Sequence, residues 1–127
     1  MMNSRGHDIV KELFNVNIAA FETLALQVFL YQYHKNETYR QFCNALHIAP
    51  EDVGTIDQIP FLPIQFFKSR NICTTVFEPE IVFESSGTTG SINSRHCIKE
   101  LAVYEESFQK NFQLLYGDVT GWCIVGL

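Results

Sequence analysis

Several features that assign short chains to a class are missing from this sequence. No apolar run reaches the roughly 18 residues that a membrane-spanning helix needs, and the N-terminus lacks the basic start and small-residue cleavage site of a secretion signal. The chain also has no internal repeat and no low-complexity linker that would divide its 127 residues into domains. These absences predict a cytoplasmic protein with no membrane span.

Positive charge is scarce as well. The net charge is -5 and the isoelectric point lies near 5.2, and no basic patch interleaved with aromatic residues is present. We therefore expect no nucleic-acid partner. With 46% hydrophobic and 18% charged residues, the composition is that of an ordinary globular domain with one modest core, so disorder is not expected.

The cysteines lack the spacing of a metal or redox site. They stand far apart, with no CxxC motif and no Cys/His cluster, at Cys43, Cys73, Cys97 and Cys123. This pattern predicts neither a zinc site nor a thioredoxin-like pair. We expect four buried free thiols.

The most informative segment that is present is Phe83 to Asn93, FESSGTTGSIN. Gly87 and Gly90 allow backbone conformations that bring N–H groups close to an anion. Hydroxyl donors surround them, at Ser85, Ser86, Thr88, Thr89 and Ser91. The segment predicts a loop that binds phosphate, and the alternative is a Ser/Thr/Gly-rich hairpin turn at the edge of an ordinary sheet.

This loop matches neither GxGxxG nor the Walker pattern. SSGTTG instead resembles the phosphate-binding motif of the adenylate-forming superfamily. Upstream lies IPFLPIQFFKSR, Ile59 to Arg70, and this order of motifs resembles the LuxE-type acyl-protein synthetases. The matching residues are Ile59, Pro60, Pro63, Phe67, Lys68, Phe83, Ser85 to Gly90, Ser94, His96 and Tyr104.

The resemblance implies ATP and Mg²⁺ as cofactors, with no metal ligands from the protein among the candidate residues. A fatty or aromatic carboxylate would attack the α-phosphate, and the acyl group would pass from the adenylate to a thiol. An acyl-accepting protein or a reductase subunit is the implied partner. The residues implied to bind the nucleotide are Ser85, Ser86, Gly87, Thr88, Thr89, Gly90, Ser91 and His96, and no catalytic residue is assigned.

Two points stay open. The lysine that many acyl-CoA ligases carry after this loop is absent, so the positive charge would come from Lys68, Arg70, Arg95 or Lys99. The acceptor thiol is also undetermined: coenzyme A is one alternative, and in the resembled family the accepting cysteine lies far toward the C-terminus. Besides the enzymes that use a protein thiol or coenzyme A as the acceptor, a third interpretation of the sequence is a non-catalytic domain whose helices bind a partner subunit.

Apolar spacing gives the expected elements. It predicts a well-buried helix over 18–33 capped by Asn17, and a second over 37–46 capped by Asn36, the pair forming a helical hairpin. The remaining predictions are a short helix over 64–70, strands over 80–84 and 94–98, a helix over 100–116 ended by Gly117, and a buried strand over 122–127.

The predicted fold class is mixed α/β, with a helical part at 1–55 and a strand–loop–strand–helix–strand part at 56–127. The resemblance implies the first portion of an adenylate-forming domain. Because the sequence ends within an apolar strand, we expect a truncated domain whose unpaired edge favours a homo-oligomer.

Overall fold

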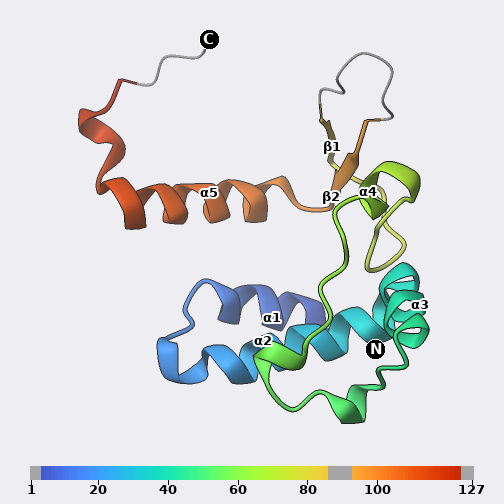
Figure 1. Ribbon diagram of the computed structural model, residues 1–127. Coiled ribbons are helices and arrows are strands. Elements are labelled where there is room, and N and C mark those ends of the chain that lie inside the picture. The colour runs from blue at the N-terminus through green and yellow to red at the C-terminus, as the bar shows by residue number, and fades with distance from the viewer. Residues whose placement is uncertain (1–3, 86–92, 124–127) are drawn as a thin grey trace.

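The computed structural model describes residues 4–85 and 93–123, and they form two layers (Figure 1). One layer holds helices α1 (Ser4–Leu13), α2 (Ile18–Lys35) and α3 (Glu37–Ala45). The other holds α4 (Phe66–Ser69), the strands β1 (Ile81–Glu84) and β2 (Arg95–Ile98), and α5 (Leu101–Tyr116). Short 3-10 turns cover Pro50–Asp52, Ile56–Gln58 and Val119–Gly121.

Asparagine side chains begin the two central helices, as predicted. The side chain of Asn17 accepts a hydrogen bond from the backbone N–H of Ala20 at 2.9 Å, and that of Asn36 accepts from Tyr39 at 3.0 Å. Each satisfies a backbone donor that has no partner within its helix. Asn36 is also the single residue between α2 and α3, so one buried side chain sets both boundaries.

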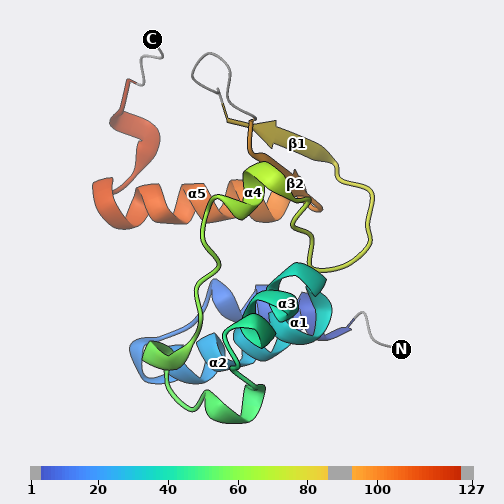
Figure 2. The same ribbon diagram turned by 45° about the vertical axis from the view of Figure 1, so that its right-hand side comes forward.

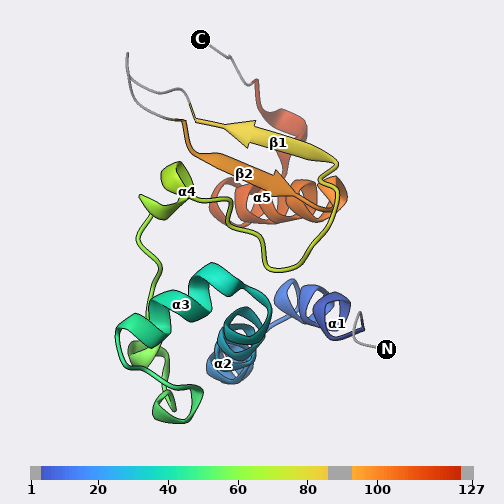
Figure 3. The same cartoon turned by 90° about the vertical axis from the view of Figure 1, so that its right-hand side faces the viewer.

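Helices α2 and α3 pack against each other as the predicted pair, but they do not run antiparallel as in a regular helical hairpin. Figure 3 shows α2 end-on while α3 runs across the view, and Figure 1 shows α2 running across the view. A linker of one residue is too short to reverse the chain, so the helices meet at a steep angle. Helix α1, which was not predicted, also lies beside α2, and Gly6 of α1 packs close to the Tyr31 side chain.

The core is small. Phe29, Tyr39 and Cys43 form its buried cluster, and Ile59 and Leu62 of the IPFLP segment pack against it. The prediction of a well-buried α2 is only partly correct, because Leu24 and Phe29 are buried whereas Ile18 is 98% exposed. Apolar spacing identifies the apolar residues of a helix but does not determine whether another element covers them.

The two strands form the predicted hairpin. They pair antiparallel, with Phe83 opposite His96 and Glu84 opposite Arg95. The pairing continues to Ser85 and Ser94, which therefore lie side by side. The segment 86–92, which carries most of the predicted loop, lies outside the described residues.

Helix α5 packs beside the hairpin (Figure 3). It ends at Gly117, whose φ of 78° is accessible to glycine at little cost, as predicted. No residue of α5 is buried, however. The predicted strand over 122–127 falls mostly outside the described residues, and Trp122, which is described, is 54% exposed and not in a strand.

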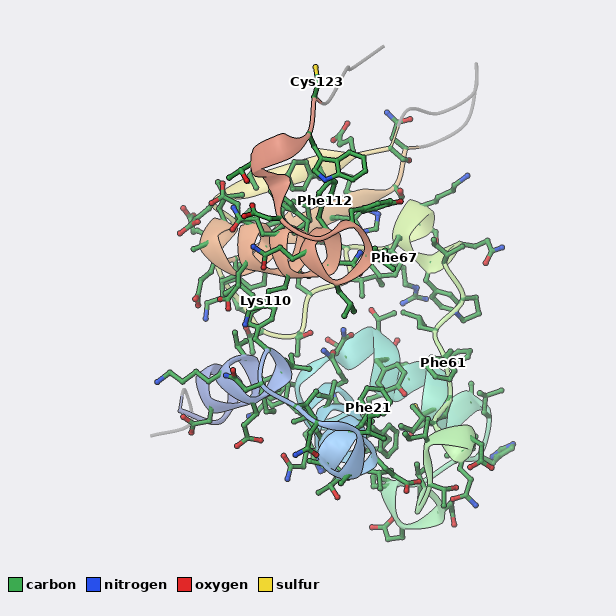
Figure 4. The ribbon with its side chains drawn as sticks, turned by 90° about the vertical axis from the view of Figure 1, so that its left-hand side faces the viewer. Phe21, Phe61, Phe67, Lys110, Phe112 and Cys123 are labelled. Atoms are coloured by element: carbon green, nitrogen blue, oxygen red, sulfur yellow. The ribbon has the colours of Figure 1, made fainter. Side chains whose placement is uncertain are left out.

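A few polar contacts join the layers. Lys110 of α5 points toward α1 (Figure 4); its Nζ donates to the carbonyl of Phe14 at 3.2 Å and lies 4.8 Å from the centre of the Phe14 ring. The hydroxyl of Thr74 donates to the side-chain oxygen of Gln32 at 2.8 Å. Figure 2 shows the extended segment that rises from the helical layer, after the 3-10 turn Ile56–Gln58, to α4.

The mixed helix and strand class is confirmed. Within the described ranges, no helix is long and apolar enough to cross a membrane. The adenylate-forming domain, the division at residue 55, self-association and the cytoplasmic location stay predictions.

Candidate functional site

Two serines close the base of the predicted phosphate loop. The backbone N–H of Ser85 donates to the carbonyl of Ser94 at 3.1 Å, which extends the strand pairing by one step. In return, the backbone N–H and the hydroxyl of Ser94 donate to Ser85 Oγ at 3.1 and 2.9 Å. Ser94 is 7% exposed. The two ends of the loop are therefore held together by three hydrogen bonds.

These contacts orient the hydroxyl of Ser85. A serine oxygen accepts two hydrogen bonds and donates one. Because Ser94 supplies both donors that Ser85 Oγ accepts, the remaining capacity of Ser85 is its own O–H donor. That donor stands at the beginning of the predicted phosphate loop.

His96 lies directly behind this pair. Its Nε2 is 3.3 Å from Ser94 Oγ. Because the Ser94 hydroxyl donates to Ser85, it is left to accept from His96, which favours the histidine tautomer with a proton on Nε2. Of the predicted nucleotide-binding residues, Ser85 and His96 are described and lie in one chain of hydrogen bonds through Ser94. The others fall on 86–92, outside the described residues: Ser86, Gly87, Thr88, Thr89, Gly90 and Ser91.

The upstream motif contacts the same histidine. Phe67 of α4 stacks on the His96 ring, with ring centroids 4.8 Å apart and an interplanar angle of 23°. Phe67 belongs to the segment IPFLPIQFFKSR, so the two motifs behind the family resemblance touch through this stack. A stacked pair of this kind contributes about 0.5 to 1.5 kcal/mol beyond its buried area.

The other end of the upstream motif is anchored in the helical layer. The hydroxyl of Tyr39 donates to the carbonyl of Pro60 at 2.6 Å, and both residues are buried. Burial, with the nearby Cys43, raises the pKa of Tyr39. The motif thus connects the buried core of the helical layer to the base of the loop.

The candidate cations have different surroundings. Arg95 pairs with Glu84 across the hairpin at 3.3 Å, and Lys99 pairs with Glu100 at 3.7 Å. Arg70 donates to the side-chain oxygen of Gln41 at 3.4 Å. Lys68, next to Phe67, forms no ion pair within the described part of the chain. All of these cations are exposed, so the pairs are weak and exchangeable.

An open cavity of about 800 Å³ lies between the layers. Its walls are mainly apolar and come from α1, α2, the segment after α4, β2 and the first turns of α5. Cys73 and Cys97 lie in this wall. The prediction of four buried thiols is wrong, because only Cys43 is buried, whereas Cys73 and Cys97 are partly exposed and Cys123 is exposed.

Burial raises the pKa of the Cys73 thiol, and the adjacent Cys97 adds to that effect. In the described residues, no group of three or more His, Cys, Asp or Glu side chains is placed to hold a metal ion.

The base of the predicted phosphate loop is thus joined to the proline-containing motif through the stacked ring of His96. The model of the acyl-protein synthetase family LuxE matches residues 12–115. The chain belongs to this family.

Individual proteins similar to this chain are consistent with the family match. The chain is 31% identical over 96 residues to a long-chain-fatty-acid–luciferin-component ligase of Aliivibrio fischeri, and 43% identical over 61 residues to that of Vibrio harveyi. The matches cover 75% and 47% of this chain but 25% and 16% of the relatives. A third such ligase, from Photorhabdus luminescens, is 37% identical over 68 residues, 53% of this chain and 58% of that protein. No solved structure matches the chain.

Sequence reasoning missed several contacts at this site. Ser94 was noted only as part of a motif, and the Phe67–His96 stack was not anticipated. Glu80 was also missed: its carboxylate accepts from the backbone N–H of Leu101 at 2.6 Å and so caps α5. An acidic residue before a strand carries no sequence signal that it caps a helix about twenty residues later.

Proposed function

We propose that this chain supplies the phosphate-binding part of an enzyme that activates a long-chain fatty acid with ATP. The carboxylate oxygen attacks the α-phosphorus, the bond to the bridging oxygen of pyrophosphate breaks, and an acyl-adenylate forms. A thiol then attacks the acyl carbon and releases AMP. The observation that carries the proposal is the Ser85–Ser94–His96 chain at the base of an SSGTTG loop in a member of the LuxE family.

The residues at the loop base fit a phosphate group. Ser85 Oγ accepts both hydrogen bonds from Ser94 and keeps its own O–H donor, and hydroxyl and backbone N–H groups are the donors that stabilise charge on a departing pyrophosphate. Mg²⁺ suits this setting because it is held largely by substrate phosphates and water, with one or two carboxylates at most. Glu84, at the end of β1, is a carboxylate at this position.

Two cations support the site. Lys68 lies next to the residue that stacks on His96 and forms no ion pair within the described residues. Arg95 stands at the other end of the loop, and its exposed pair with Glu84 is weak enough for a phosphate to displace the carboxylate. We propose that Lys68 and Arg95 replace the lysine that other adenylate-forming enzymes carry after the loop.

The curated relatives are named for a long-chain fatty acid. An alkyl chain of that kind needs an apolar surface, and the cavity between the layers has mainly apolar walls and a volume of about 800 Å³. We propose a fatty acid as the substrate and a protein thiol or coenzyme A as the acceptor.

Carboxylate-dependent exchange of pyrophosphate into ATP tests the proposal. It is measured on the polypeptide that contains this sequence at its natural length, with fatty and aromatic acids of graded size. Gly87→Val and Thr88→Val are the loop variants, and Thr38→Val, on α3 of the helical layer, is the matched control. Exchange that the loop variants lose and the control keeps supports the proposal. A folded protein that exchanges with no acid contradicts it.

A further inference from the structure

Two cysteines from distant parts of the sequence meet at one asparagine. Cys73 lies in the irregular segment between α4 and β1, and Cys97 lies in β2. The Sγ atoms of both donate to Asn71 Oδ1, at 3.5 Å from Cys73 and 3.6 Å from Cys97. Since both sulfurs lie against the same oxygen, they are at most about 7 Å apart. Both side chains also line the cavity between the layers.

A second observation supports their closeness. Besides sharing Asn71 Oδ1, Cys97 is near enough to be among the causes that raise the pKa of Cys73. The other two cysteines have no such neighbour thiol: Cys43 is fully buried in the helical layer, and Cys123 lies beyond α5, far from that layer (Figure 4). Cys73 and Cys97 are therefore a pair by position and by surroundings.

The pair is accessible to a small reagent. Both residues are partly exposed, and the cavity that they line is open. A disulfide requires the two sulfur atoms to approach to about 2.05 Å. Residues 71–80 form neither helix nor strand, so the backbone around Cys73 can adjust without breaking a regular element.

We propose that Cys73 and Cys97 are a redox modification site that forms a reversible intramolecular disulfide with a low-molecular-weight disulfide such as oxidised glutathione. The thiolate of one cysteine attacks a glutathione sulfur, the glutathione disulfide breaks, and one glutathione thiolate leaves. The thiolate of the second cysteine attacks the cysteine sulfur of this mixed disulfide and expels the second glutathione. Two cysteine thiols are oxidised, one glutathione disulfide is reduced, and the two protons go to the departing thiolates.

The crosslink would act on the base of the predicted phosphate loop. Cys97 is adjacent to His96 in β2, and His96 contacts Ser94. A covalent bond from β2 to the segment after α4 would therefore restrain the strand that closes the loop. This consequence rests on the proposed function, whereas the disulfide itself does not.

Peptide mapping tests the disulfide directly. The chain is incubated with oxidised glutathione, free thiols are blocked with N-ethylmaleimide, and the protein is cleaved with trypsin. Cleavage after Arg70, Arg95 and Lys99 places Cys73 and Cys97 on separate peptides, 71–95 and 96–99. We expect these two peptides to be joined and to separate on reduction. In the folded protein, glutathione on each cysteine singly, or two blocked thiols, would overturn the proposal.

Single variants provide the controls. Cys73→Ser and Cys97→Ser each retain one thiol of the pair, and we expect that thiol to carry glutathione and no joined peptides to form. Oxidation in high urea should lose the preference for the 73–97 link and join other cysteines. An equal yield of that link in folded and unfolded protein would show that the structure does not bring the two thiols together, and would also overturn the proposal.

Exchange of pyrophosphate into ATP separates this proposal from the proposed function. We expect oxidation to lower the exchange rate at least threefold in the natural-length protein and reduction to restore it. If neither redox state shows exchange, the proposed function fails and the mapped disulfide still stands. If exchange is present but the joined peptides are absent, the disulfide fails alone.

Discussion

The hydroxyl of Ser94 lies 2.9 Å from that of Ser85, across the two ends of the segment that carries the predicted phosphate loop. Ser94 immediately precedes β2, the strand that returns from the loop, and Ser85 immediately follows β1, the strand that enters it. Their contact fixes the separation of the loop ends and leaves the Ser85 O–H as the donor. Among the described residues, Ser85 and Ser94 thus organise the base of the loop.

Replacing Ser94 with alanine should weaken this base. The variant loses the hydroxyl that donates to Ser85 and contacts His96, in a nearly buried position. We expect the free energy of unfolding in urea to fall by about 1 to 2 kcal/mol, and the KM for ATP in the exchange assay to rise several-fold. Ser69→Ala, on the exposed end of α4, is the matched control and should change neither quantity measurably. An unchanged KM for Ser94→Ala would contradict the role of this contact.

Phe67 and Phe66 offer a test of the link between the two motifs. Phe67 stacks on His96, whereas the adjacent Phe66 packs edge-on against Phe42 of the helical layer. Both residues are partly exposed, so alanine at either position should cost a similar amount of stability. We expect Phe67→Ala alone to raise the KM for ATP, because it frees the His96 ring. Equal effects of both variants on KM would mean that the stack does not position the site.

The Tyr39 hydroxyl should be a strong contributor to stability. Its bond to the Pro60 carbonyl is buried, so Tyr39→Phe leaves that carbonyl without a donor and without water, at a cost of about 1 to 3 kcal/mol. Tyr33→Phe is the control, since Tyr33 donates to Asn44 at 2.9 Å in an exposed position where water can replace it. Urea unfolding of the two variants compares the costs. A larger loss for Tyr33→Phe would be inconsistent with the buried bond.

Stability should decline at alkaline pH. Burial raises the pKa of the Cys43 thiol. It also raises the pKa values of Tyr39 and Cys73. Above about pH 8.5, where an unfolded cysteine loses its proton, the unfolded chain binds fewer protons than the folded one, so the free energy of unfolding falls as pH rises. Tyr39 adds to this fall above about pH 10.

Urea midpoints at pH 7.5, 9.0 and 10.5 measure this decline. The stabilisation is complete below the unfolded pKa and is lost toward the higher folded pKa. Cys43→Ala should remove part of the fall between pH 7.5 and 9.0. A midpoint that is constant over this range in the original sequence would exclude the coupling.

The short-range features of this fold could be predicted from the sequence. Asn17, Asn36 and Gly117 act on backbone groups within a few residues, so their chemistry alone locates the helix ends. The hairpin also follows from two apolar runs around a Ser/Thr/Gly segment. The family resemblance could likewise be recognised from the sequence, because it rests on two motifs whose residues are close together in the chain.

The long-range contacts could not be predicted. Glu80 caps a helix that begins at Leu101, and Asn71 accepts from thiols 2 and 26 residues away. Nothing in the local sequence marks either pairing. Burial was overestimated for a related reason: Ile18 and Trp122 are apolar but exposed in this chain. Periodicity records which residues are apolar, whereas burial depends on what packs against them.

The most direct test of the central claim follows an oxygen atom from the fatty acid. A long-chain acid labelled with ¹⁸O in its carboxylate is turned over with ATP and an acceptor thiol by the natural-length protein, and the nucleotide product is analysed by mass spectrometry. If the carboxylate attacks the α-phosphorus, one ¹⁸O atom appears in AMP, and the Ser94→Ala variant forms labelled AMP more slowly. If the label appears in inorganic phosphate together with ADP, the acid attacks the γ-phosphorus and the adenylate account is wrong.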